Sequence, residues 1–252
     1  MFDLLKLRFR HGCQAIRDIQ HAEVISTYRG FPVIDESKCS DNCSECKNVC
    51  PASAIDINPL RLDLGKCTFC GECESVCKSG AIKFSSQHKL GASSRESLII
   101  SSGKIFEEYD STAVQTKKEI EKVFGRSLKL RQVSAGGCNG CELELAAASN
   151  VNFDMGRFGI DFVASPRHAD GIVITGPISK NMAPALMDAF KSISEPKIII
   201  AVGACAISGG IFYESLELNR IFFNEIKVDL YIPGCPPHPL TFINAVLKFI
   251  GK

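Results

Sequence analysis

The sequence has no tryptophan, and its charge is almost balanced, with 29 Lys and Arg residues against 28 Asp and Glu residues. A net charge of +1 gives no electrostatic reason to expect nucleic acid or another strongly charged partner. The sequence also lacks the roughly 18 to 20 consecutive apolar residues of a membrane-spanning helix. Asp3, Lys6, Arg8 and Arg10 stand where a signal peptide would be apolar, so we expect a cytoplasmic protein.

Sequence motifs for nucleotide binding and hydrolysis are also missing, because the chain has no Gly-x-Gly-x-x-Gly, no P-loop and no nucleophile elbow. What the chain has instead is 13 cysteines in 252 residues. In a reducing cytoplasm, clustered cysteines bind metal more often than they form disulfides. The cysteines are therefore the residues most informative about function.

Eight of the cysteines form two runs that repeat one pattern. The second run has C-x2-C-x2-C-x3-C spacing, which is typical of bacterial ferredoxins with two clusters. In that pattern the fourth cysteine of each run ligates the other cluster. The pattern assigns one [4Fe-4S] cluster to Cys39, Cys43, Cys46 and Cys77, and the other to Cys67, Cys70, Cys73 and Cys50.

Two features of the runs depart from the ferredoxin pattern. Three residues separate Cys39 from Cys43 where the pattern has two, which makes Cys39 the weakest of these assignments, and Lys78 replaces the usual proline. The alternative is a pair of structural zinc sites, which also use C-x2-C pairs. Zinc does not explain the third and fourth cysteine of each run, so we favour two cubane clusters.

Four further cysteines stand in loops marked by glycine or proline in the second half of the chain. Cys138 and Cys141 have C-x-x-C spacing at the start of an expected helix, whereas Cys205 and Cys235 are single and follow apolar runs. The ends of parallel strands meet at one edge of a sheet, so we expect these loops to converge. Four thiolates there suit a [4Fe-4S] cluster, with tetrahedral zinc as the alternative.

Apolar strands alternate with helices in this half, which predicts an α/β fold with an open parallel sheet covered on both faces. We expect strands at 128–133, 160–164, 172–175, 197–202 and 230–232. We expect helices near 112–124, 141–148, 183–192, 216–223 and 240–250.

The chain divides into four expected parts. They are a helix and lead-in at 1–28, an α+β two-cluster ferredoxin-like domain at 29–84, a linker and helix at 85–125, and the α/β domain at 126–252. The first helix is expected over 1–19, with Phe2, Leu5 and Phe9 at helical spacing and basic residues between them. It rests either on a membrane surface or membrane subunit or on soluble protein, and the sequence leaves both open.

Five motifs in this order resemble the small subunit of membrane-bound group 4 [NiFe]-hydrogenases, a family similar to the 20-kDa iron–sulfur subunit of respiratory complex I. They are Cys-Asn-Gly-Cys-Glu at 138–142, Ser-Pro-Arg-His-Ala-Asp at 165–170, Thr-Gly-Pro at 175–177, Gly-Ala-Cys-Ala-Ile-Ser-Gly-Gly-Ile-Phe at 203–212 and Pro-Gly-Cys-Pro-Pro at 233–237. Residues 1–84 resemble the two-cluster ferredoxin subunit of the same complexes, as if two subunits were fused. The separated Cys138 and Cys141 favour the hydrogenase branch, because the complex I subunit has adjacent cysteines there.

The resemblance implies a flavodoxin-like second domain with a proximal [4Fe-4S] cluster facing a large catalytic subunit. That partner would hold the nickel–iron centre, with membrane subunits and an electron donor or acceptor protein completing a complex on the cytoplasmic face of the membrane. This chain would relay electrons through three [4Fe-4S] clusters for proton reduction or hydrogen oxidation, without a complete active site of its own. The alternatives are a complex I-like subunit of a nickel-free oxidoreductase that reduces quinone or another acceptor, and a zinc-stabilised interaction protein.

Five other residues have both a functional and a structural interpretation. Glu142 follows a cysteine at a helix N-terminus, where it is either on a proton path near the subunit interface or favoured by the helix dipole. Arg167 either hydrogen-bonds near the proximal cluster and raises its potential or forms a salt bridge. For His168 and His238, which stands where the family commonly has arginine, we expect loop contacts. Cys13 has no nearby partner, so we expect an incidental thiol.

Overall fold

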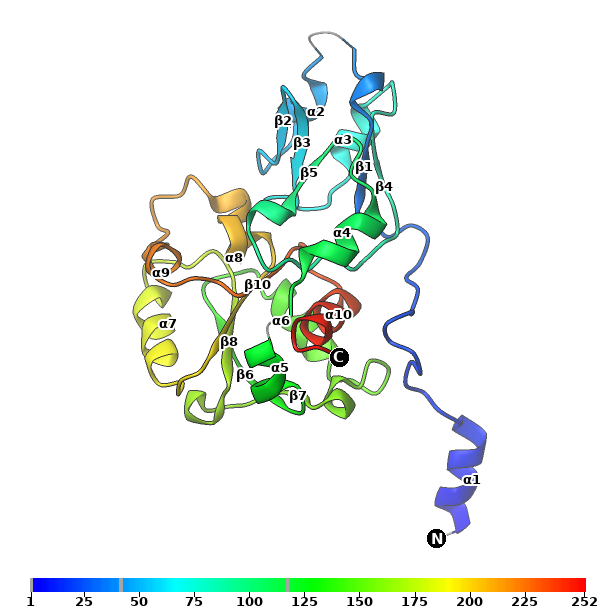
Figure 1. The fold of residues 1–252 in the computed structure, drawn as a ribbon, viewed down its shortest axis with the longest axis vertical. Coiled ribbons are helices and arrows are strands. Elements are labelled where there is room, and N and C mark those ends of the chain that lie inside the picture. Colours follow the sequence, from blue (N-terminus) through cyan, green and yellow to red (C-terminus); the bar gives the residue numbers. More distant parts are fainter. Residues whose placement is uncertain (1, 41–42, 117) are drawn as a thin grey trace.

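The computed structural model describes residues 2–40, 43–116 and 118–252. The chain forms a larger lobe around a parallel sheet and a smaller lobe that contains the first two runs of cysteines (Figure 1). No helix within these ranges has the length and apolar character needed to span a bilayer.

The larger lobe has a five-stranded parallel sheet in the order β10-β9-β8-β6-β7. The strands are β6 (Leu128–Ser134), β7 (Ile160–Phe162), β8 (Gly171–Thr175), β9 (Ile198–Val202) and β10 (Leu230–Ile232). Counted along the chain this order is 2-1-3-4-5, which is the flavodoxin-like arrangement. The expected fold class is therefore confirmed.

Helices cover both faces of this sheet. They are α6 (Gly140–Ala147), α7 (Met182–Lys191), α8 (Ala204–Ser208), α9 (Ile221–Glu225) and α10 (Pro239–Phe249). One face packs α6 and α10 against alternate side chains such as Val173 and Ile200, while the other packs α7 and α9 against Ile172 and Ile199 (Figure 1). Every position of β8 and β9 is buried, which explains their continuous apolar sequences.

The smaller lobe repeats a unit of strands and a short helix. Its elements are β1 (Pro32–Ile34), α2 (Glu45–Val49), β2 (Ile55–Ile57), β3 (Leu60–Asp63), α3 (Glu72–Val76) and β4 (Ile82–Phe84). β1 pairs with β4 in one antiparallel sheet, and β2 pairs with β3 in another. This arrangement fits the two-fold repeat that the cysteine runs predicted.

Residues 85–103, expected to be a linker, contribute structure to both lobes. Their strand β5 (Ile99–Ser101) pairs with β3 and extends the small sheet to three strands. Ala92 forms an antiparallel bridge with Tyr231 of β10, with reciprocal N–H to O distances of 2.9 and 2.8 Å. This segment therefore joins the smaller lobe to the edge of the larger sheet.

Two expected helices differ from the observed ones. The helix expected over 112–124 is two helices, α4 (Phe106–Ala113) and α5 (Lys118–Phe124). The helix is interrupted between α4 and α5, because Ser93 forms two hydrogen bonds with the backbone there. Its N–H donates to Ala113 O, and its Oγ accepts from Gln115 N. The helix expected over 216–223 is limited to α9, since Leu218 bridges Ser179 in extended backbone. Tertiary hydrogen bonds replaced helical ones in both places.

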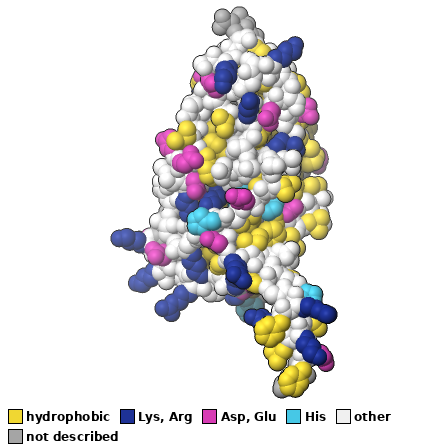
Figure 2. Space-filling view, turned by 90° about the vertical axis from the view of Figure 1, so that its right-hand side faces the viewer, with side chains coloured by type: hydrophobic (Ala, Val, Ile, Leu, Met, Phe, Trp, Pro, Cys, Tyr) yellow, Lys and Arg dark blue, Asp and Glu magenta, His cyan; other side chains and the backbone are white. Residues whose placement is uncertain are grey.

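The N-terminal helix is shorter than expected and does not pack on the protein. α1 spans Phe2–His11, without a buried residue, and projects from the body with apolar and basic side chains exposed (Figures 1 and 2). Met1, where the expected helix begins, lies outside the described residues. The expected remainder of the helix is an extended strap, because Asn244 Nδ2 donates to Ile19 O and Ile16 N donates to Asn152 O. Ile19 is 2% exposed and anchors the strap.

A buried histidine gives the folded state a pH dependence. His88 is 5% exposed, and its Nε2 has no hydrogen-bond partner among the described residues. Burial, with smaller contributions from His238 and Lys89, lowers the pKa of His88 to about 4. Since this pKa lies below the unfolded value of about 6.5, the folded state binds fewer protons. Stability is therefore full above pH 6.5 and falls as the pH drops toward 4.

We expect the wild-type protein to lose roughly 1 kcal/mol of stability between pH 7.5 and 5.5 through His88, or about 2–4 °C in Tm. Thermal denaturation of the anaerobic protein, followed by circular dichroism at both pH values, measures this loss. His88→Leu should abolish that part of the pH dependence, whereas His168→Leu, at an exposed histidine, should keep it. Equal pH dependence in wild type and His88→Leu would contradict this assignment.

Candidate metal centres

The four cysteines of the second half lie at the carboxyl ends of strands in the parallel sheet, and we call them the proximal set. Cys138 follows β6, Cys141 lies in the first turn of α6, Cys205 lies in the first turn of α8 after β9, and Cys235 follows β10. Cys141 and Cys205 each lie close enough to other members of the set to interact with them electrostatically. The fold therefore brings together loops from distant parts of the sequence, as the sheet topology predicted.

Glycines let the backbone approach these sulfurs closely. A Cβ at Gly203, where φ is +87°, would lie 2.6 Å from Cys141 Sγ. A Cβ at Gly140 would lie 3.5 Å from Cys138 Sγ and 3.7 Å from Pro236. Position 203 therefore needs glycine, whereas a Cβ at position 140 would make only ordinary van der Waals contacts.

Burial and neighbouring charges disfavour the thiolate form of two cysteines in the proximal set. Burial, followed by the charges of Glu142 and the other cysteines, raises the pKa of Cys141 to about 12, and burial with Cys235 and Cys138 raises the pKa of Cys205 to about 11. Without metal these thiols are neutral at pH 7. Cationic iron deprotonates coordinating thiols and removes their mutual repulsion, so assembly at this site releases protons.

Glu142 is anchored beside the proximal set. Thr175 Oγ1 donates to its Oε1 at 2.6 Å, and Ser134 also hydrogen-bonds the carboxylate. Burial acts to raise the pKa of Glu142, but these two hydrogen bonds outweigh it and the pKa is lowered. The ionised carboxylate also lies in the first turn of α6, where the helix dipole favours it.

A second set, the middle set, consists of Cys67, Cys70, Cys73 and Cys50. Burial raises the pKa of Cys67, and burial followed by the charges of Cys50 and Cys70 raises that of Cys73 to about 12. Cys50 belongs to the other run in sequence, yet it lies close enough to Cys73 to interact with it electrostatically. Backbone N–H groups of Ala54 and Phe69 donate to Cys50 Sγ and Cys67 Sγ, each at 3.3 Å.

The distal set lines a cavity of about 420 Å³ in the smaller lobe, and its members are Cys39, Cys43, Cys46 and Cys77. The pKa of Cys39 is raised by burial and then by Cys43 and Cys77, so the longer loop does not remove Cys39 from this set. Asp41 and Asn42, in that loop, lie outside the described residues. A cavity lined by four thiols fits a group with several metal atoms, to which each thiol supplies one ligand.

Within the described ranges, no three His, Cys, Asp or Glu side chains form a group that could hold a single metal ion. Cys13 lies apart from the three sets and is exposed, with Sγ 3.6 Å from Ala15 O.

The structure also shows where three other residues singled out in the sequence lie. Arg167 and His168 are exposed on a short 3-10 helix (Pro166–His168). His238 Nδ1 accepts from Leu240 N at 3.1 Å and so caps α10, while its ring lies edge-on to Tyr28 with centroids 5.8 Å apart. Burial lowers the pKa of His238, which keeps the imidazole neutral.

Arg220 was not among the expected site residues, yet its guanidinium donates to a carbonyl of Cys205. Nothing in the sequence marks it, because its partners are backbone atoms from other loops.

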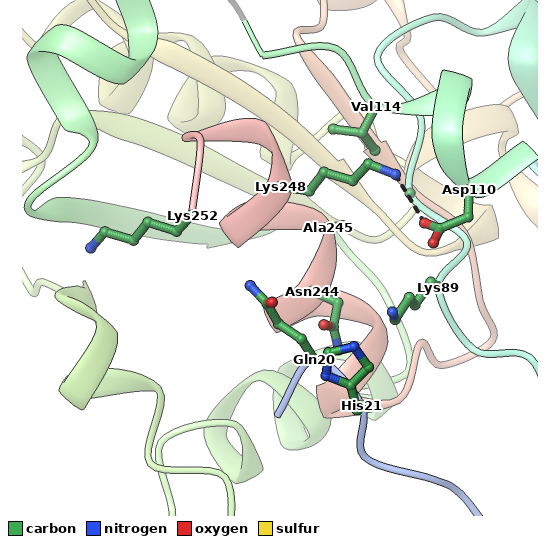
Figure 3. Close-up of a pocket in the computed structure, with 10 residues that line it drawn as sticks. Gln20, His21, Lys89, Asp110, Val114, Asn244, Ala245, Lys248 and Lys252 are labelled. Atoms are coloured by element: carbon green, nitrogen blue, oxygen red, sulfur yellow. Dashed lines mark hydrogen bonds and ion pairs between the residues drawn. The ribbon is translucent and has the colours of Figure 1, made fainter. Parts of the chain in front are cut away.

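A cavity of about 190 Å³ between the N-terminal strap, α4 and α10 lies away from the cysteines, and Figure 3 shows Lys248 in it paired with Asp110 at 2.9 Å.

We expect Gly203→Ala to prevent a cluster from assembling on the proximal set, because the added Cβ meets Cys141 Sγ. Iron and acid-labile sulfide per chain should each fall by about four, the content of one cubane. Gly103→Ala is the matched control, since Gly103 also has positive φ, at +79°, but nothing lies within 4 Å of an added Cβ. Unchanged iron content in Gly203→Ala would show that glycine is not needed at position 203.

Comparisons with known proteins agree with both lobes. Residues 138–249 match the family described as NADH ubiquinone oxidoreductase, 20 Kd subunit, and residues 31–78 match a 4Fe-4S dicluster domain. The chain is 40% identical over 131 residues to the probable membrane-bound hydrogenase subunit mbhJ of Pyrococcus furiosus, over 52% of this chain and 78% of that protein.

Two further relatives come from different complexes. Formate hydrogenlyase subunit 7 of Escherichia coli is 42% identical over 142 residues, 56% of each chain. An NADH-quinone oxidoreductase subunit of Citrifermentans bemidjiense is 41% identical over 112 residues, 44% of this chain and 65% of that protein.

The proximal set lies within the first matched region, and the distal and middle sets lie within the second. These matches, together with the parallel sheet that carries the proximal set, bear out the family resemblance seen in the sequence. The chain belongs to the family of the 20-kDa complex I subunit and the membrane-bound hydrogenase subunits, and it is an iron–sulfur electron-transfer subunit that carries a 4Fe-4S dicluster domain N-terminal to the family domain.

Proposed function

We propose that the chain holds three [4Fe-4S] clusters, one on each cysteine set, and relays electrons to or from the [NiFe] site of a partner large subunit. The observation that carries this proposal is the gathering of twelve thiols into three sets of four. The relatives named after hydrogenase and formate hydrogenlyase support a hydrogen-linked reaction, 2H⁺ + 2e⁻ ⇌ H₂, carried out by the partner.

Electrostatic interactions between neighbouring sets support one order for the three clusters along the electron-transfer path. Cys235 of the proximal set interacts electrostatically with Cys70 of the middle set. The loops that carry these two cysteines line one cavity of about 350 Å³. Cys73 of the middle set in turn interacts electrostatically with Cys46 of the distal set. Electrons would therefore pass between the distal cluster, at the far end of the smaller lobe, and the proximal cluster through the middle one.

The clusters would supply the one-electron steps. The residues of this chain would set the reduction potentials of the clusters and partly shield them from water. Each thiol supplies one sulfur ligand, while N–H donors stabilise negative charge on those sulfurs and so favour the reduced state. Ala81 N donates to Cys77 Sγ at 3.2 Å in the distal set, as Ala54 N and Phe69 N do in the middle set. Cys67 and Cys73 of the middle set are buried, whereas Cys70 is exposed.

Partners and location follow from the same proposal. A nickel-containing large subunit would cover the proximal set, where Glu142 would lie on a proton path near the interface, and an electron donor or acceptor protein would meet the distal set. Membrane subunits would hold the chain on the cytoplasmic face of the membrane, with the exposed α1 available for contact. We propose that the ferredoxin-like domain, expected at 29–84, also includes β5 from the expected 85–125 segment, and that 126–252 is the second domain.

A second candidate function is a subunit of a nickel-free oxidoreductase that reduces quinone or another acceptor. The match to the 20 Kd subunit family and the relative named after NADH-quinone oxidoreductase support it. Nickel analysis of the complex purified with its large subunit distinguishes the two. About one nickel per complex supports the hydrogenase function, and its absence from an active complex supports the alternative.

The three-cluster proposal predicts close to twelve irons and twelve acid-labile sulfides in the anaerobically purified chain, without nickel or zinc. Metal analysis, sulfide assay and electron paramagnetic resonance after reduction measure these quantities. About eight of each would remove one cluster from the proposal, and Cys39→Ser would then test the distal set. Zinc without sulfide would exclude electron transfer and favour a zinc-stabilised interaction protein.

The order of the clusters predicts a specific pattern of magnetic coupling. In the fully reduced chain, the proximal signal should be broadened by the middle cluster. Cys73→Ser should remove this broadening by eliminating the middle cluster, whereas Cys46→Ser, the matched change in the distal set, should leave it. Both cysteines are buried in equivalent short helices, so the two variants carry a similar packing cost. Equal effects of the two changes would rule out the proposed order.

A further inference from the structure

Arg220 connects loops around the proximal set. Its Nη1 donates to Pro177 O and Cys205 O, each at 3.2 Å, and its Nη2 donates to Ala206 O at 2.8 Å and Ile207 O at 3.0 Å. Pro177 belongs to the loop after β8, and the other three carbonyls belong to α8 after β9. One side chain therefore fixes two strand-end loops relative to each other.

Three of the four bonds reach backbone carbonyls of the short helix α8. A helix leaves its last carbonyls without intrahelical partners, and α8 has only five residues. After Ser208 the chain turns at Gly209, with φ at +93°, and Gly210, with φ at +56°. A Cβ at Gly210 would lie 2.9 Å from Cys205 Sγ, so the turn folds back onto the ligand. Gly209 N already donates to Cys205 O at 2.8 Å, and Arg220 adds a second donor there as well as donors to Ala206 O and Ile207 O, so it helps to hold Cys205 in place.

The guanidinium also brings charge close to the site. Arg220 and Cys205 interact electrostatically, and each perturbs the pKa of the other. No salt bridge to a carboxylate involves Arg220 in the described part of the chain; its other contact is the ring of Phe223, 5.1 Å from its central carbon. An arginine remains charged at any working pH, so its field is permanent and not cancelled by a bonded carboxylate.

We propose that Arg220 is a positioning residue for Cys205 and that its charge raises the reduction potential of the proximal cluster. A nearby cation lowers the energy of the more negative, reduced cluster, and cluster potentials depend on net charge in this way. This inference rests on the proposed [4Fe-4S] cluster of the proximal set. It assigns to Arg220 the role that the sequence offered to Arg167, whose side chain is exposed.

The test compares Arg220→Gln, Arg220→Lys and wild type as full-length chains purified anaerobically. Redox titration followed by electron paramagnetic resonance gives the potential of the proximal cluster, and iron analysis gives its occupancy. Arg220→Gln should shift the potential downward or lose only the proximal signal, while Arg220→Lys, which keeps the charge and can still donate, should stay closer to wild type. Arg157→Gln is the matched control, since Arg157 also donates to a backbone carbonyl and stacks on a phenylalanine, but its partners Ile16 and Phe158 are outside the loops that carry the three cysteine sets.

The outcomes separate this inference from the function on which it rests. A wild-type chain without a proximal signal overturns the proposed function. A wild-type chain with that signal, and Arg220→Gln with the same potential and occupancy, overturns only the role of Arg220. Equal effects of the Gln and Lys variants also overturn it, because rescue by lysine is what a charge-bearing positioning residue requires. A shift as large in Arg157→Gln would mean that the change is general and not local, which likewise contradicts the inference.

Discussion

The constraint on which the structure depends is the confinement of thiols that repel one another once ionised. Burial and like charge together hold the pKa values of Cys73, Cys141 and Cys205 near 11 or 12, so without metal these groups are neutral sulfhydryls. Iron reverses this preference, because it binds the thiolate and neutralises its charge. Iron binding would therefore displace the protons that burial keeps on these three thiols.

A wire also needs its clusters at fixed separations, and the connecting segment supplies this rigidity. Ala92 bridges Tyr231 at the edge of the large sheet. Arg95 forms a two-point ion pair with Asp63 of β3, at 2.7 and 2.5 Å. The fully buried Tyr109 donates to Leu90 O at 2.6 Å and so fastens α4 to the same segment. The loops that carry Cys70 and Cys235 line one cavity and are therefore held together within a single chain.

Backbone atoms carry much of the specificity of these sites. Glycine at 203 and 210 lets the chain pass within a side chain's width of a sulfur, and N–H groups near the middle and distal sets donate to the ligands themselves. Arg220 acts on backbone carbonyls as well. Such interactions do not depend on the identity of the residues that supply the N–H or C=O groups, which limits what sequence motifs reveal about them.

The sequence by itself determined the fold class and the five strands of the large sheet, and it predicted a grouping of the cysteines. Cysteine spacing reports local wrapping around a cluster, and apolar periodicity reports which strands are buried on both faces. Tertiary structure decided what depends on contacts between distant segments. It divided the helix expected over 112–124 at Ser93, turned the expected linker into β5 and shortened the N-terminal helix to α1. It also placed Arg220 beside Cys205, because a side chain that binds carbonyls far away in sequence leaves no periodic or compositional signal.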